Sequence, residues 1–138
     1  MNRATTILPV GPLKVPKAKR ARTRVKRKPG EMNKTEKAYS DFLAARTLSG
    51  SDVNAYWFES VTFKLGHDTR YTPDFLVQMA DGSLECHDTK GWDTEPAAAV
   101  KERVSSSMFP LFVFKEVRKV DGRWVEKVIG PKEVHPCP

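Results

Sequence analysis

The fold is decided by residues 71–91, which read YTPDFLVQMADGSLECHDTKG. Two short runs, residues 75–79 and 83–87, flank the tripeptide Ala80-Asp81-Gly82. Runs of this length around a turn that contains glycine are typical of a β-hairpin. The stretch therefore predicts two antiparallel strands that are joined by a tight turn.

The length of the loop decides which side chains of the hairpin face each other. A three-residue loop, with Gly82 in the left-handed conformation, sets Asp74 opposite Asp88 and leaves Lys90 on the same face. We favour this register because it brings two carboxylates and one ammonium into a single small site.

A two-residue Asp81-Gly82 turn is the alternative. It shifts the register by one, so that Asp74 lies across from Thr89 and beside Glu85 and His87. In that register Glu85 becomes a candidate metal ligand. In the favoured register Glu85 and His87 point to the opposite side of the strand, where His87 is structural.

The residue types of the trio Asp74, Asp88 and Lys90 indicate a particular kind of chemistry. Two carboxylates that face each other repel, and each raises the pKa of the other unless a cation lies between them. Mg²⁺ binds few carboxylates, keeps several waters and takes substrate phosphate in its remaining positions. Its chemistry is to polarise a phosphoryl oxygen and to activate a water, while a lysine orients that water or stabilises charge on phosphorus. The trio therefore predicts hydrolysis of a phosphodiester with Mg²⁺, for which Mn²⁺ can substitute.

The same residues carry a family resemblance. Pro73-Asp74, thirteen intervening residues and Asp88-Thr89-Lys90 resemble the signature of the PD-(D/E)XK, or restriction-endonuclease-like, nuclease superfamily. The longer pattern of residues 70–75 with 87–91 is similar to a family of small phage and prophage proteins that share this nuclease-like core. The resemblance covers roughly residues 32–130.

The resemblance implies a fold and a set of roles. The implied fold is a three-layer α/β core with a mixed central β-sheet flanked by helices. Asp74 and Asp88 would bind the metal with the backbone carbonyl of Thr89, and Lys90 would position the water. A first-helix glutamate, here Glu36, often joins the metal site in such nucleases. Asp88 departs from the more common Glu, and its shorter reach alters the metal geometry.

Charge divides the chain into unequal parts. The 138 residues suffice for one domain with a real core. The net charge is +7, but residues 1–30 hold ten Lys and Arg and no acid, which leaves a net −3 on the remainder. We therefore expect a flexible basic arm over residues 1–31, a nuclease-like domain over 32–130 and a tail over 131–138.

The basic arm predicts contact with DNA. Phosphate contacts of this kind weaken steeply with salt and position a duplex without reading its sequence. A solubilising tail or a docking site for a protein partner is the alternative. Arg70 can meet a phosphate or pair with a nearby acid, and Lys101 can face the substrate or solvent. The candidate DNA-binding residues are Lys17, Lys19, Arg20, Arg22, Arg24, Lys26, Arg27, Lys28, Arg70 and Lys101.

The first half of the domain predicts a helix and one long strand. Asn33 can cap a helix that runs to about Leu48, with Glu36 as its capping-box partner, so Glu36 is a candidate for both cap and metal ligand. Residues 56–65 alternate and predict a half-buried strand with Trp57 on its apolar side. Residues 66–70 predict a turn, in which His67 is a solvated residue rather than an acid or base.

The second half predicts a helix and two strands. The helix opens at Thr94 and runs to about Ser106, with Ala97, Val100 and Val104 as its buried stripe. Residues 111–114 are typical of a buried parallel strand, and Asp121-Gly122 turns the chain into an edge strand over 123–129, in which Trp124 packs. This order independently predicts an α/β fold with a mixed sheet.

The two cysteines, Cys86 and Cys137, are too few for a disulfide framework, and Cys86 is expected to be a buried thiol. A cytoplasmic, reducing compartment fits this cysteine usage, and the resemblance to phage and prophage proteins implies a phage-infected or lysogenic bacterial host cell. No apolar run approaches a membrane span, and His135-Pro136-Cys137 makes only a weak ligand pair.

The expected function is a Mg²⁺-dependent DNA endonuclease that acts on duplex or branched DNA, with a homodimer as one assembly. Two other classes compete with it. A DNA-binding accessory protein on an inactive nuclease-like scaffold would bind DNA without metal. A protein-interaction or inhibitor module would have little affinity for free DNA at physiological salt.

Overall fold

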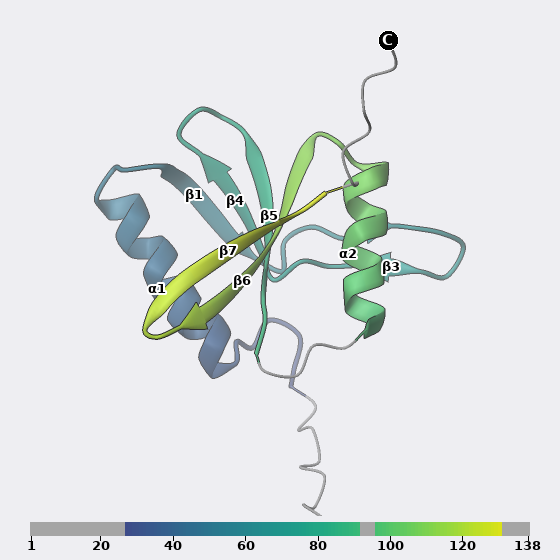
Figure 1. Ribbon diagram of the computed structural model, residues 1–138, viewed down its shortest axis with the longest axis horizontal. Coiled ribbons are helices and arrows are strands. Elements are labelled where there is room, and N and C mark those ends of the chain that lie inside the picture. The colour runs from purple at the N-terminus through teal and green to yellow at the C-terminus, as the bar shows by residue number, and fades with distance from the viewer. Residues whose placement is uncertain (1–26, 92–95, 131–138) are drawn as a thin grey trace, which may run out of the picture.

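Two helices lie on opposite sides of one β-sheet (Figure 1). The computed structural model describes residues 27–91 and 96–130. The predicted arm, apart from residues 27–31, and the predicted tail lie outside these residues. The elements, in chain order, are α1 (Lys34–Leu48), β1 (Val53–Phe58), β2 (Phe63–Lys64), β3 (Arg70–Tyr71), β4 (Phe75–Met79), β5 (Leu84–Thr89), α2 (Pro96–Met108), β6 (Phe112–Val120) and β7 (Arg123–Ile129).

The main sheet is mixed, as predicted. Its strand order is β1-β4-β5-β6-β7, and β5 and β6 run parallel while the other neighbours are antiparallel. The parallel pair is possible because α2 carries the chain from the end of β5 back to the start of β6. Strands β2 and β3 form a separate two-stranded sheet on the α2 side (Figure 1).

The hairpin of β4 and β5 has the favoured register. Phe75 pairs with His87, and the backbone N–H of Met79 donates to the carbonyl of Ser83 at 2.9 Å. Gly82 has a φ of 87°, the left-handed conformation that closes a three-residue loop without a Cβ clash. The alternative two-residue turn is therefore wrong.

Two apolar clusters hold the layers together. On the α1 side, Tyr39 and Leu43 of the helix pack on Phe75, Val77 and other residues of the sheet. On the α2 side the buried cluster consists of Phe63, Tyr71, Cys86 and Phe114. Because neighbouring residues of β5 point to opposite faces, the buried thiol of Cys86 lies on the α2 side and His87 on the α1 side. Burial raises the pKa of Cys86 to about 12.

The predicted strand over residues 56–65 is wrong in extent and in phase. The strand β1 begins at Val53 and ends at Phe58, and the chain joins the small sheet only at Phe63. Glu59 interrupts the ladder with a φ of 45°, which few non-glycine residues adopt. Phe58 packs on the core, whereas Trp57 is 45 % exposed. Alternation of residue type carries no signal for such a break.

The predicted buried stripe of α2 is also wrong. Val100 and Val104 are 49 % and 38 % exposed, while Glu102, Ser105 and Ser106 are buried. The serine hydroxyls donate to carbonyls one turn back, which satisfies them without a partner outside the helix. The helix also continues to Met108, and its predicted start at Thr94 lies outside the described residues.

The end of the chain largely follows the prediction. The strand β6 is parallel to β5 but runs to Val120, well beyond the expected residue 114, and Leu111 is exposed. Asp121 and Gly122 both have positive φ and turn the chain into the edge strand β7. Trp124 packs against Tyr39 with ring centroids 4.9 Å apart, which confirms its packing role. Neither described helix is long and apolar enough to cross a membrane.

Candidate active site

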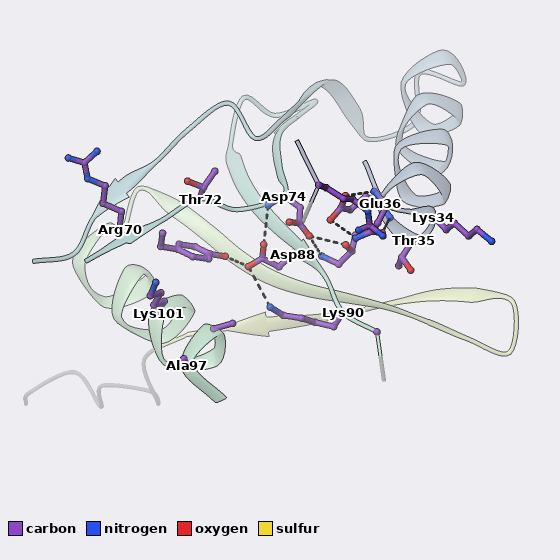
Figure 2. A pocket seen from close by; sticks show the side chains of 16 residues that line it. Lys34, Thr35, Glu36, Arg70, Thr72, Asp74, Asp88, Lys90, Ala97 and Lys101 are labelled. Atoms are coloured by element: carbon purple, nitrogen blue, oxygen red, sulfur yellow. Dashed lines mark hydrogen bonds and ion pairs between the residues drawn. The ribbon is translucent and has the colours of Figure 1, made fainter. Parts of the chain in front are cut away.

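A cavity of about 780 Å³ opens where the hairpin, the start of α1 and the start of α2 meet. Figure 2 shows Asp74, Asp88 and Lys90 converging in it, with Glu36 beside Asp74. The three-residue loop register is what places these side chains together, because it aligns residue 74 with residue 88. The sequence thus predicted the contents of this cavity correctly for its central trio.

Asp74 lies just before β4 and is anchored by the end of β5. Its Oδ2 accepts hydrogen bonds from the Thr89 backbone N–H at 2.9 Å and from the Thr89 hydroxyl at 2.8 Å. Burial and the nearby charge of Asp88 nevertheless raise the pKa of Asp74 to about 7, against the effect of these bonds. Asp74 therefore carries an electrostatic penalty that a cation would relieve.

Asp88, on β5, is 5 % exposed, and each of its two oxygens accepts one hydrogen bond. Its Oδ1 accepts from the backbone N–H of Asp74 at 3.0 Å, and its Oδ2 accepts from the hydroxyl of Tyr71 on β3. Burial, together with the charge of Asp88, raises the pKa of Tyr71, so the phenol remains a proton donor. The small sheet thus contributes one hydrogen bond to the site.

Lys90 directly follows β5, and both its backbone N–H and its side-chain Nζ have partners. Its backbone N–H donates to the carbonyl of Val117 at 2.9 Å, and its Nζ lies 3.9 Å from Asp88 Oδ2. The same Nζ forms an ion pair with Glu102 of α2. Burial opposes the charge of Lys90, but Asp88 and Glu102 outweigh it and raise the pKa of Lys90. The ammonium is therefore a permanent positive charge in this cavity.

Glu36 has the predicted role in the capping box. Its Oε2 accepts from the Asn33 backbone N–H at 2.7 Å, and the Asn33 side chain accepts from the Glu36 N–H at 2.8 Å. Glu36 also lines the cavity, and its charge contributes to the raised pKa of Asp74. Glu36 thus both caps α1 and lines the cavity. Its role as a metal ligand stays a prediction.

Basic side chains surround the cavity mouth. Arg27, Lys34, Arg70 and Lys101 line it, from the segment before α1, from α1, from β3 and from α2. In Figure 2, Arg70 points away from the carboxylates, and the structure shows no ion pair for it within residues 27–91 and 96–130. Lys28 is exposed outside the lining. The other predicted DNA-binding residues, Lys17, Lys19, Arg20, Arg22, Arg24 and Lys26, lie outside the described residues.

The remaining candidates lie away from the cavity. His67 is exposed in its turn and, within the described residues, pairs only with its neighbour Asp68, at 3.1 Å, as expected of a solvated residue. Glu85 and His87 face α1, where His87 Nε2 lies 2.7 Å from Glu85 Oε2. Neither is a part of the site, in keeping with the favoured register. The pair of His135 and Cys137 lies outside the described residues.

The acidic pair fits a hard divalent cation that is bound mostly through water. Within the described part of the chain, no three His, Cys, Asp or Glu side chains form a ligand cage. Mg²⁺ needs only one or two carboxylates, and the bonds of Asp74 to Thr89 use Oδ2 and leave Oδ1 for other partners. The raised pKa of Asp74 is the sign of fit, because a cation beside the pair would relieve the repulsion.

Two residues of the site were not foreseen. Tyr71 belongs to the quoted stretch, but its contact with Asp88 depends on the small sheet, whose strands are only two residues long. Glu102 was hidden by the assumed apolar stripe, since a helix that buries Val100 and Val104 places residue 102 on its outer side. The small residues Ala98 and Ser105 on the same face as Glu102 were the only signal for its true orientation.

Comparison with protein-family models, with curated proteins and with solved structures finds no match to this chain. The resemblance to the PD-(D/E)XK nucleases therefore rests on the motif and stays a prediction.

Proposed function

We propose that this chain is a Mg²⁺-dependent DNA endonuclease that hydrolyses phosphodiester bonds. The observation that carries the proposal is the meeting of Asp74, Asp88 and Lys90 in one cavity with a basic rim. Two buried carboxylates are costly unless a cation compensates them. A basic rim around such a pair suits a substrate that is itself a polyanion.

Each residue has a definite task in this proposal. Asp74 and Asp88 would hold the cation, with the carbonyl of Thr89 as a further ligand and Glu36 reaching it directly or through water. Bound there, the ion supplies a Lewis acid and an activated water. The Lys90 ammonium lies beside Asp88 and would orient that water and stabilise negative charge at phosphorus. Thr89 keeps Asp74 oriented through its N–H and hydroxyl.

The rim residues would bind the DNA backbone rather than its bases. Lys34, Arg70 and Lys101 come from three separate elements and line the mouth of the cavity. Phosphate contacts of this kind position a strand without reading its sequence, and each one releases counterions. We therefore expect weak sequence preference, a steep loss of affinity with salt and, on a small core with a basic arm, a preference for branched DNA.

A cleavage assay tests the proposal. Supercoiled plasmid, linear duplex and a four-way junction are incubated with Mg²⁺, Mn²⁺ or EDTA and with wild type, Asp74→Ala or Lys90→Ala. Glu85→Gln, on the opposite face of β5, is the matched control. We expect metal-dependent cutting by wild type and by the control, and a loss of at least about 100-fold in both site variants.

The assay also separates the other functional classes. Binding of DNA without cutting, unchanged by EDTA, would identify an accessory DNA-binding protein, a reading favoured by the lack of a three-residue ligand cage within the described residues. Absence of DNA binding at physiological salt would identify a protein-interaction module. Cutting that survives both substitutions would show that the site lies elsewhere.

A further inference from the structure

The carboxylate of Glu102 is unusual for a helix of this kind. It is 2 % exposed, and no hydrogen-bond partner reaches either of its oxygens from the described residues. Its cation is the Lys90 ammonium, with which it forms an ion pair, but the carboxylate of Asp88 also lies close to it. Burial and the charge of Asp88 raise the pKa of Glu102 to about 8, against the effect of Lys90. A buried carboxylate beside one cation and another acid is expensive, and an apolar residue at this place would serve the packing of α2 better. Packing alone therefore gives no reason for a glutamate at position 102.

The position of Lys90 supplies that reason. Its ammonium lies between two acids, in ion-pair contact with Glu102 but 3.9 Å from Asp88 Oδ2. The second distance exceeds a direct N–H···O hydrogen bond, so the lysine does not block the Asp88 carboxylate. Glu116, beside Asp88 on β6, also faces this group but pairs with Arg118 at 3.9 Å. Glu102 is thus the acid that holds the ammonium.

Without Glu102 the balance of forces would change. The remaining negative charges that act on Lys90 are those of Asp88 and Glu116, and Asp88 lies beside Asp74. Because Glu116 is paired with Arg118, the flexible side chain of lysine would move towards Asp88 and form a direct ion pair with it. An ammonium in that place would compete with a divalent cation for the same oxygens.

We propose that Glu102 is a positioning residue, whose buried carboxylate holds the Lys90 ammonium at the side of the Asp74–Asp88 pair and so keeps the pair open to a cation. The inference rests on the proposed function for its catalytic consequence. Its geometric part, the tether of Lys90 to Glu102, stands independently of any reaction.

The first test uses the metal-free protein. In ¹⁵N-labelled wild type at low temperature, the tethered Lys90 is expected to show a slowly exchanging ammonium signal, assigned by its loss in Lys90→Met. Glu102→Gln should abolish that signal, whereas Glu116→Gln should keep it, and Glu102→Asp should recover it in part. A Lys90 signal that is unchanged in Glu102→Gln would overturn the proposal. Melting curves check that each variant is folded, and if Glu102→Gln does not fold, Glu102→Asp alone must weaken the signal.

The second test titrates Mn²⁺ alone into the same variants. Glu102→Gln is expected to weaken Mn²⁺ binding about tenfold, but to have no effect when Lys90 is already replaced by Met. An equal loss in the Lys90→Met background would mean that Glu102 contacts the metal itself, which contradicts a positioning role. Wild type that binds no Mn²⁺ would count against the proposed nuclease, while the ammonium signal would still decide the tether.

The third test measures cleavage. Glu102→Gln should lower kcat at least about tenfold with little change in KM for DNA, because the rim that binds DNA is intact. In the Lys90→Met background it should cause no further loss. A fully additive loss would show that Glu102 acts independently of Lys90 and would refute the proposal.

Discussion

Ionisable side chains are buried on both faces of β5, but the two faces differ in how far the charges of these side chains are compensated. On the α1 face, Glu85 lies between His87 and Lys115, at 2.7 Å and 3.0 Å. His87 also bonds the Tyr39 hydroxyl at 2.6 Å, so both ring nitrogens are used. On the α2 face, Asp88 and Glu102 share the Lys90 ammonium, and Asp74 lies beside Asp88 without an ion pair among the described residues. The buried charges of the α1 face are thus paired with one another. The α2 face has a surplus of acidic side chains and opens to a cavity.

The difference separates a structural network from a candidate site. Since the carboxylate of Glu85 only accepts, His87 Nε2 donates to it, and His87 Nδ1 is hydrogen-bonded to the Tyr39 hydroxyl. Although burial opposes it, the bonds of Glu85 with His87 and Lys115 lower the pKa of Glu85. Burial and the neighbouring carboxylate instead raise the pKa of Asp74 to about 7. Buried charge by itself is thus no sign of function, whereas uncompensated charge at a cavity is.

Replacing the lysine of each face should give the largest contrast. Lys90→Met is expected to lower cleavage at least about 100-fold, because it removes the charge beside the scissile phosphate. Lys115→Met should leave cleavage per folded molecule within about twofold but lower the free energy of unfolding by about 3 kcal/mol, because the buried carboxylate of Glu85 loses its lysine, while Glu126 keeps Arg46. Cleavage rates and urea unfolding of both variants measure this. Equal losses of activity would remove the distinction between the faces.

His87 lies at the centre of the hydrogen-bond network on the α1 face. His87→Phe should lower the free energy of unfolding by about 2 kcal/mol, because Tyr39 and Glu85 both lose a buried partner. Tyr39→Phe, which removes one hydrogen bond only, should cost about 1 kcal/mol. Urea titration gives both values. A substantial change in cleavage by folded His87→Phe would indicate that this face also takes part in the chemistry.

The faces should respond to pH with opposite sign. The pKa of Asp74 is raised from 3.8 to about 7. Between these values the folded state holds a proton that the unfolded state has lost, so the free energy of unfolding falls as pH rises. Asp74→Asn should therefore match wild type near pH 4 and exceed it by about 4 kcal/mol near pH 8.

Glu85 provides the comparison for this titration. Its pKa is lowered, so its contribution to stability is present above the unfolded value of 4.5 and is lost as pH falls below it. Glu85→Gln should thus be less stable than wild type at pH 7 and approach it in acid. Thermal unfolding across pH 3–9 covers both variants, and parallel curves for wild type and Asp74→Asn would contradict the assigned electrostatic penalty.

The smallest effect is expected where α1 touches the site. Asn33→Ala removes the capping box and should lower the free energy of unfolding by about 1 kcal/mol. The same change removes the bond from Asn33 Nδ2 to Glu36 and leaves only the bond from the backbone N–H of residue 33. Cleavage should therefore change by less than about threefold if Glu36 is mainly a cap. Cleavage assays with Glu36→Gln sharpen the result, since a large loss there would assign Glu36 to the metal.

Local spacing explains why the central trio was predictable. The turn at Gly82 and the period of two along a strand suffice to align Asp74 with Asp88 and Lys90, with no information from distant parts of the chain. The capping box of Asn33 and Glu36 spans only three residues and is equally local.

The predictions from sequence were wrong where contacts between distant parts of the chain determine the local structure. At the break after β1, Glu59 still bonds the Asp74 carbonyl through its N–H, at 2.8 Å, while its carboxylate accepts from the backbone N–H of Gly30, a contact between residues 29 positions apart. The rotation of α2 follows from what the sheet presents to it, which includes the ammonium of Lys90. Hydrophobic periodicity assumes an apolar partner, so it turned Val100 and Val104 inward and Glu102 outward.

The sequence by itself determined the hairpin, its register, the cap of α1 and the α/β order, because each depends on spacing along a few covalently linked residues. Only the tertiary structure decided which charges are balanced. It brought Tyr71 to Asp88, Glu102 to Lys90 and Lys115 to Glu85 across long stretches of chain. Electrostatic balance is a property of distances in space, and these become defined only when the helices dock on the sheet.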